Sequence, residues 1–299
     1  MTAPAPDRHD KLHHEAALAG SGLPPLLLEA DHLINTVTAG LHGRRRAGMG
    51  ETFWQYRPYV AGDVSTQIDW RQSARSSNRL YIRQREWEIA ATAWLWRDPG
   101  HSLDYASSAD LPTKRYRAEV LATALTGMLA RAGERVGYAG LHRQPFLGRK
   151  AAELFAAELM THGVHEDRLP PVIAAEGHKR CVLFSDFFLA PDDLEPRLKA
   201  IAAAKTTGCL VQIVDPAEED YPFQGRTEFL SPGGTDAPLL FGDAGAVARE
   251  YARLFRAHHD WLADVCRHYG WSLLLHRTDH RPEAALIALY RALSPEAPV

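Results

Sequence analysis

The stretch Arg180-Cys-Val-Leu-Phe-Ser-Asp186 decides the fold class of this chain. Its apolar residues run without the alternation of a half-exposed strand, which is typical of a strand buried on both faces of a sheet. Helical periodicity follows at 192–207, and a second apolar strand at 209–214 ends at Asp215. A buried strand, a helix and another buried strand in this order predict a parallel unit with a right-handed crossover.

The same alternation extends in both directions from this unit. Further strands are predicted at 90–97, 135–142 and 271–276, and further helices at 114–132, 149–161, 245–269 and 282–293. Residues 144–147 are expected to return beside the strand at 135–142 as a short hairpin. These elements predict an α/β domain over residues 90–299, with a mostly parallel sheet and helices on both faces.

The first 89 residues differ in character from the rest. Residues 1–24 are small, polar and proline-bearing and predict a flexible tail, and apolar residues recur at helical spacing between 25 and 41. Residues 42–86 then hold nine arginines against four acidic residues, with turn-formers between short β-like pieces. We therefore predict a helix and an Arg-rich, β-containing leader over residues 25–89.

Composition narrows the classes of protein to which the chain can belong. It has 299 residues, of which 45% are hydrophobic and 24% charged, with a net charge of −3, which excludes collagen-like and fully disordered chains. Its three cysteines, Cys181, Cys209 and Cys266, are too few and too dispersed for a disulfide framework. No apolar run reaches the length of about 18 residues that a membrane helix needs, so we expect no membrane insertion and a cytoplasmic location.

Acidic residues follow three of the predicted strands. Asp98, Asp186 and Asp215 each come directly after a strand, and the carboxyl ends of parallel strands lie along one edge of a sheet. The loop Asp98-Pro-Gly-His-Ser102 adds a hydroxyl, and carboxylate and hydroxyl oxygens suit Mg²⁺, Ca²⁺ or Mn²⁺. The alternative is that Asp98 and Asp186 bind loop amides and the start of the following helix, and that Asp215 is a turn residue.

The loop at 98–102 resembles the D-x-S-x-S metal-ion-dependent adhesion site of von Willebrand factor A (vWA) domains, with Asp186 as the later acidic partner. Gly100 stands in place of the middle serine, and Thr161 is the candidate for the threonine of the third loop. The resemblance implies a degenerate site in which Asp98, Ser102 and Asp186 bind a divalent cation (Mg, Ca or Mn). A metal-free site, in which only the scaffold is retained, stays open.

A second resemblance lies upstream, in an ordered series of short motifs. These are Gly43-Arg-Arg-Arg-Ala-Gly-Met-Gly-Glu-Thr-Phe53, Arg57-Pro-Tyr59, Gly62-Asp63, Ile68-Asp-Trp-Arg71 and Ala74-Arg75. The series is similar to the leader of the bacterial family called "domain of unknown function 58", whose members pair it with a vWA-like domain. The resemblance implies a vWA/Rossmann-like α/β fold behind the leader, and a MoxR-type AAA+ ATPase as partner.

The leader also offers a contact surface. Its arginines and aromatic residues have the composition of a protein-binding hot spot; the candidate residues are Arg57, Tyr59, Asp63, Asp69, Trp70, Arg71 and Arg75. A structural alternative makes Gly62-Asp63 a turn and pairs Asp69 with Arg57, Arg71 or Arg75. Nucleic-acid binding is disfavoured because acidic residues interrupt the basic ones.

Together these features predict a non-enzymatic cytosolic adaptor that contacts a MoxR-type ATPase in chaperone-like maturation or remodelling. The alternative is a Mg²⁺-dependent hydrolase or phosphoryl-transfer enzyme that uses Asp98 and Asp186. No pairing of nucleophile and base is evident in the sequence, which favours the adaptor.

Overall fold

The computed structural model describes residues 25–42, 53–60, 68–75, 80–85, 92–140, 144–161, 165, 167–173, 179–231, 233 and 237–293. The chain divides into two units, one formed by residues 1–40 with 91–299 and the other by residues 41–90. The predicted tail at 1–24 and the predicted turn at Gly62-Asp63 lie outside the described residues.

A five-stranded parallel sheet organises the larger unit. Its strands are β3 (Thr92–Arg97), β4 (Arg135–Tyr138), β5 (Lys179–Ser185), β6 (Thr206–Val214) and β9 (Ser272–Arg277). They lie in the order β4-β3-β5-β6-β9, and every neighbouring pair is parallel. The predicted fold class, an α/β protein with a parallel central sheet, is confirmed.

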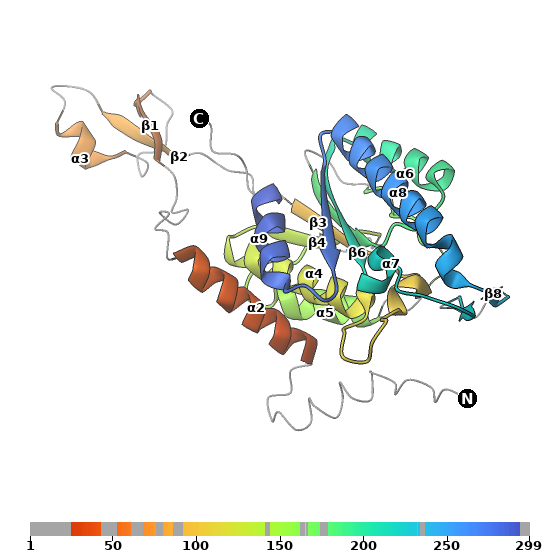
Figure 1. Ribbon diagram of the computed structural model, residues 1–299. Coiled ribbons are helices and arrows are strands. Elements are labelled where there is room, and N and C mark those ends of the chain that lie inside the picture. Colours follow the sequence, from red (N-terminus) through yellow and green to blue (C-terminus); the bar gives the residue numbers. More distant parts are fainter. Residues whose placement is uncertain are drawn as a thin grey trace. The chain divides into compact units, whose positions relative to one another are not determined.

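Helices cover both faces of this sheet (Figure 1). On one face lie α4 (Lys114–Arg131), α5 (Ala151–Thr161) and α9 (Pro282–Leu293), and on the other α6 (Pro191–Ala203) and α8 (Ala248–His268). The second face carries a core in which Leu183 and Leu210 of the sheet pack with Leu198 and Leu262 of the helices. No helix within the described ranges combines the length and apolar character needed to cross a membrane.

Helix α2 (Pro25–His42) packs against α4. Tyr116 of α4 donates a hydrogen bond of 2.7 Å to Glu29. Ile34 approaches the backbone of Gly127 so closely that a Cβ added there would lie 2.5 Å from the Ile34 Cδ1 atom. The structure thus places α2 in the larger unit, whereas the sequence-based division places it with the leader.

The smaller unit contains an antiparallel pair, β1 (Phe53–Pro58) with β2 (Tyr81–Arg85), and the short helix α3 (Trp70–Ser73). The Asp69 side chain caps α3 by accepting a hydrogen bond of 2.9 Å from the Gln72 amide. The backbone amide of Tyr81 donates to the Ser73 hydroxyl at 2.9 Å, which ties the helix to β2. The leader therefore contains β-structure.

Several boundaries differ from those that the sequence predicts. Helix α6 ends at Ala203 because Lys205 has a left-handed φ of 54° and Thr206 begins β6. The predicted hairpin at 144–147 is reduced to one bridge between Val136 and Phe146. Helix α7 (Pro216–Asp220) and the hairpin of β7 (Thr227–Phe229) with β8 (Leu239–Phe241) were not predicted.

Candidate functional site

Asp98 and Asp186 meet at the carboxyl-terminal edge of the sheet. They follow β3 and β5, which are neighbouring strands, and neither side chain has any solvent exposure. The predicted juxtaposition at one edge is therefore present in the structure.

Arg168 joins the two carboxylates. Its Nη2 atom donates hydrogen bonds of 2.8 Å to Asp98 Oδ2 and 2.6 Å to Asp186 Oδ1, and its Nε atom adds one of 3.2 Å to Asp98 Oδ2. The Arg168 side chain keeps 20% of its surface exposed. Burial alone would lower the pKa of this guanidinium, but its hydrogen bonds and the two negative charges raise the pKa above its ordinary value.

Lys114 reaches the same place from the first turn of α4. Its side chain is 1% exposed, and its ammonium lies 2.9 Å from Asp186 Oδ2 and also binds Glu218 of α7. Burial would lower the pKa of Lys114, but the charges of Asp186 and Glu218 outweigh burial and raise it. Burial likewise opposes ionisation of Asp186, and the positive charges of Lys114 and Arg168 overcome this and lower its pKa to about 2.

Loop amides complete the contacts of the carboxylates. The Gly100 amide donates to Asp98 Oδ1 at 2.7 Å, and the Phe188 amide donates to Asp186 Oδ1 at 3.0 Å. The Ser185 hydroxyl donates to Asp98 Oδ2 at 2.6 Å. The two amide contacts are of the kind expected under the alternative in which Asp98 and Asp186 bind loop amides. We call Asp98, Lys114, Arg168, Asp186 and Glu218 the strand-end cluster.

Ser102, the third predicted ligand, lies beside the cluster. Its hydroxyl oxygen is buried and makes no hydrogen bond of normal geometry to another described residue. A weaker hydrogen-bonding interaction of this hydroxyl with Asp186 nevertheless contributes to lowering the pKa of that carboxyl group. The Thr161 hydroxyl donates a hydrogen bond of 2.9 Å to the Glu158 carbonyl within α5. Asp215 caps α7, as expected of a turn residue, and also accepts a hydrogen bond of 2.9 Å from the Ser107 amide.

This donor set does not fit a divalent cation. Each of the four oxygens of Asp98 and Asp186 already accepts a hydrogen bond from an N–H or O–H group, and two of the donors are cations. Within the described ranges, no group of three histidine, cysteine or acidic residues is arranged to hold a metal ion. The bound cation remains a prediction from the resemblance.

Helix α8 supports the turn that carries Asp186. His258 Nε2 donates to the Phe187 carbonyl at 2.8 Å, and His259 Nδ1 donates to Gln212 Oε1 at 2.8 Å. Gln212 Nε2 in turn donates to the Asp186 carbonyl at 3.3 Å. The adjacent histidines point to different partners, and together they position the turn.

Sequence reasoning did not identify Lys114, Arg168 or Glu218 as parts of the site. Lys114 carried a usable signal, because a basic residue in the first turn of a helix opposes the helix dipole unless carboxylates surround it. Glu218 lies two residues after Pro216 in a helix that was not predicted. Arg168 stands in a connection with no recognisable motif.

The candidate residues of the leader fall into three groups. Trp70, Arg71 and Arg75 are exposed, and Trp70 keeps 65% of its surface accessible. Tyr59 is half-buried, and Asp69 caps α3. Asp63 and the side chain of Arg57 lie outside the described part of the chain. Pairing of Asp69 with an arginine remains a prediction.

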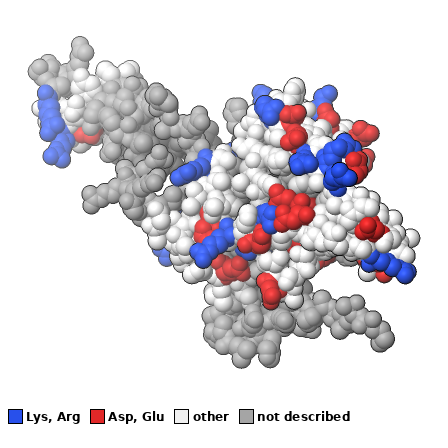
Figure 2. All heavy atoms as spheres, viewed as in Figure 1, with Lys and Arg blue, Asp and Glu red and all other residues white. Residues whose placement is uncertain are grey.

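Charges of both signs are interspersed over the face that Figure 2 shows. Among the described residues, Arg277 forms ion pairs with Asp220 at 3.0 Å and with Asp279 at 2.9 Å. A continuous basic field of the kind that attracts nucleic acid is not seen on that face among the described residues.

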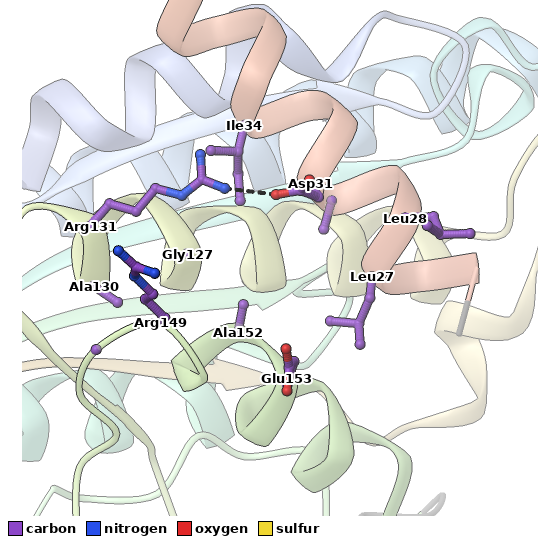
Figure 3. A pocket seen from close by; sticks show the side chains of 12 residues that line it. Leu27, Leu28, Asp31, Ile34, Gly127, Ala130, Arg131, Arg149, Ala152 and Glu153 are labelled. Carbon is purple, nitrogen blue, oxygen red and sulfur yellow. Dashed lines mark hydrogen bonds and ion pairs between the residues drawn. The ribbon is translucent and has the colours of Figure 1, made fainter. Parts of the chain in front are cut away.

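A groove of about 640 Å³ lies between α2, α4 and α5 (Figure 3). Its apolar lining includes Leu27 and Ile34, and at its rim Arg131 binds Asp31 at 2.7 Å. It contains no pair of groups suited to acid–base or nucleophilic chemistry, and we assign it no function.

The family model described as "Protein of unknown function DUF58" matches residues 55–260. The chain belongs to the DUF58 family. The match begins in the leader and ends within α8, so the DUF58 region includes residues of both units and all of the strand-end cluster. A search of curated proteins finds no match to the chain.

Proposed function

We propose that this DUF58 protein is a non-enzymatic cytosolic adaptor that binds a MoxR-type AAA+ ATPase and acts with it in chaperone-like maturation or remodelling. Its α/β unit serves as a vWA-like domain. The resemblance of the leader motifs suggests the partner, and the DUF58 match supports the family. The parallel sheet, with acidic residues gathered at its carboxyl-terminal edge, is compatible with a vWA-like domain.

The observation that carries the adaptor role is the exposure of Trp70. Its side chain is 65% exposed on α3, and Arg71 and Arg75 beside it are exposed as well. Tryptophan and arginine are among the residue types most enriched at binding hot spots. This patch therefore supports a protein contact by the leader.

The strand-end cluster, in the other unit, is compatible with this reading. Its carboxylates are bound to the cations Lys114 and Arg168, to loop amides and to the buried Ser185 hydroxyl. Hydrolysis or phosphoryl transfer by Asp98 and Asp186 is the enzymatic alternative.

A pull-down tests the proposal. The full chain is immobilised, and a MoxR-type ATPase is captured with and without ATP. Trp70→Ala, and separately Arg71→Ala with Arg75→Ala, are expected to reduce capture at least tenfold, as hot-spot truncations do. The matched control is Arg249→Ala with Arg256→Ala, which removes two exposed arginines of α8 and should bind as wild type does. No capture by wild type, or equal capture by all variants, would refute the adaptor role.

A further inference from the structure

We propose that the Arg168 guanidinium occupies the place between Asp98 and Asp186 where a divalent cation would otherwise bind. We further propose that glycine at position 100 leaves the space that the Arg168 side chain needs. The proposal goes beyond the adaptor role and does not depend on any partner. It predicts that the wild-type site is independent of metal and that removal of Arg168 creates a metal site.

The first support is the position of the guanidinium. One Nη2 atom bridges an oxygen of Asp98 at 2.8 Å and an oxygen of Asp186 at 2.6 Å. A metal ion shared by these two oxygens would have to lie in the same place between them. The guanidinium therefore excludes the ion by volume and opposes it by charge.

The second support is the fit between Gly100 and Arg168. A Cβ atom added at position 100 would lie 2.4 Å from the Arg168 Nε atom and 2.5 Å from its Cδ atom. Contacts this short do not occur between unbonded atoms, so with any larger side chain at position 100 the Arg168 side chain would have to shift from its present place. Position 100 is also where the resembled motif has its middle serine. A serine ligand at 100 and Arg168 in its present place are thus mutually exclusive.

The third support is the charge balance. Two buried carboxylates, Asp98 and Asp186, face two cations, Lys114 and Arg168, while Glu218 is 17% exposed. Loss of Arg168 leaves an uncompensated buried carboxylate, a destabilised arrangement that a bound divalent cation would relieve. The Ser102 hydroxyl oxygen, buried and without a hydrogen bond of normal geometry among the described residues, provides a third oxygen ligand.

Titration of Mn²⁺ into the chelator-treated full chain tests the proposal, with free Mn²⁺ measured by electron paramagnetic resonance. Wild type is expected to show no saturable site tighter than about 1 mM, the weak end of protein cation sites. Arg168→Ala should gain one site at least tenfold tighter, and Arg168→Ala with Gly100→Ser a tighter one still. Adding Asp98→Asn to Arg168→Ala should abolish it. The matched control is Arg149→Ala, an exposed arginine outside the cluster, which should behave as wild type.

Two outcomes overturn the proposal. One is saturable micromolar binding by wild type that Asp98→Asn removes, and the other is a folded Arg168→Ala variant that gains no site. If Arg168→Ala is unfolded without metal, Mn²⁺ should restore its circular dichroism, and Arg168→Gln, which removes the charge and shortens the side chain, should show the same gain. Failure of both variants to bind Mn²⁺ or to refold with it also overturns the proposal. None of these readouts involves a partner, so failure here is distinct from failure of the adaptor role.

Discussion

Replacement of Lys114 by methionine removes one charge from the strand-end cluster and nearly preserves the shape of the side chain. Lys114 is 1% exposed and is ion-paired with Asp186, which is fully buried, and with Glu218, which is 17% exposed. Removing one partner of a buried ion pair costs about 3–5 kcal/mol. Because Asp186 keeps Arg168 and Glu218 can regain water, we expect the lower end, about 3 kcal/mol.

The free energy of unfolding is measured at pH 7 by urea titration with tryptophan fluorescence, and the melting temperature by circular dichroism. For a unit of this size, 3 kcal/mol corresponds to a decrease of roughly 6–12 °C in the melting temperature. Lys199→Met, at an exposed position of α6, is the control and should stay within about 0.5 kcal/mol of wild type.

A second variant separates the charge effect from packing. If the ion pair carries the effect, Glu218→Gln should cost less in the Lys114→Met background than in wild type, with a coupling energy of at least about 1 kcal/mol. A loss below about 1 kcal/mol in Lys114→Met, or additive effects in the double variant, would refute the assignment of a stabilising ion pair.

Three further predictions concern the core. Burial lowers the pKa of His276 from 6.5 to about 4, so the unfolded chain takes up the proton first as the pH falls. Stability should therefore decrease by up to roughly 3 kcal/mol between pH 6.5 and 4, and urea titrations should show this slope removed by His276→Phe. A Cβ at Gly208 would lie 2.4 Å from the Trp271 ring, so thermal unfolding should show Gly208→Ala destabilised by about 1–3 kcal/mol, whereas Gly40→Ala, with nothing within 4 Å, should not be. The three cysteines are buried and their pKa values are raised, so a thiol reagent should react with them much more slowly in native protein than in urea; rapid native labelling would contradict this.

The sequence predicts the regular part of the fold because burial on both faces leaves an unmistakable pattern. The apolar run at 181–184 is a strand between two others, and the helix at 282–293, which begins at a proline, has the predicted bounds. Strands β7 and β8 escape prediction because each has three residues and none of them is buried, so neither periodicity nor burial marks them.

The site is predictable only where topology dictates it. Because β3 and β5 are neighbouring parallel strands, their carboxyl ends lie at one edge of the sheet, and this brings Asp98 and Asp186 together. The partner of both carboxylates is not dictated in this way. Arg168 lies in an irregular connection, so its approach to Gly100 becomes visible only in three dimensions.

The turn after β5 shows why the cluster is held in one arrangement. Phe187 has a left-handed φ of 55°, which an aromatic residue adopts at a cost of about 1–3 kcal/mol. That conformation turns the Phe187 carbonyl to His258 and the Phe188 amide to Asp186. Because α8 and β6 bind one side of this turn while Lys114 and Arg168 bind the other, Asp186 cannot move without breaking contacts to both. Under the proposal that Arg168 takes the place of an ion, this rigid and already neutralised carboxylate would keep the edge of the sheet ordered, and the glycine at position 100 leaves the space that the arginine occupies.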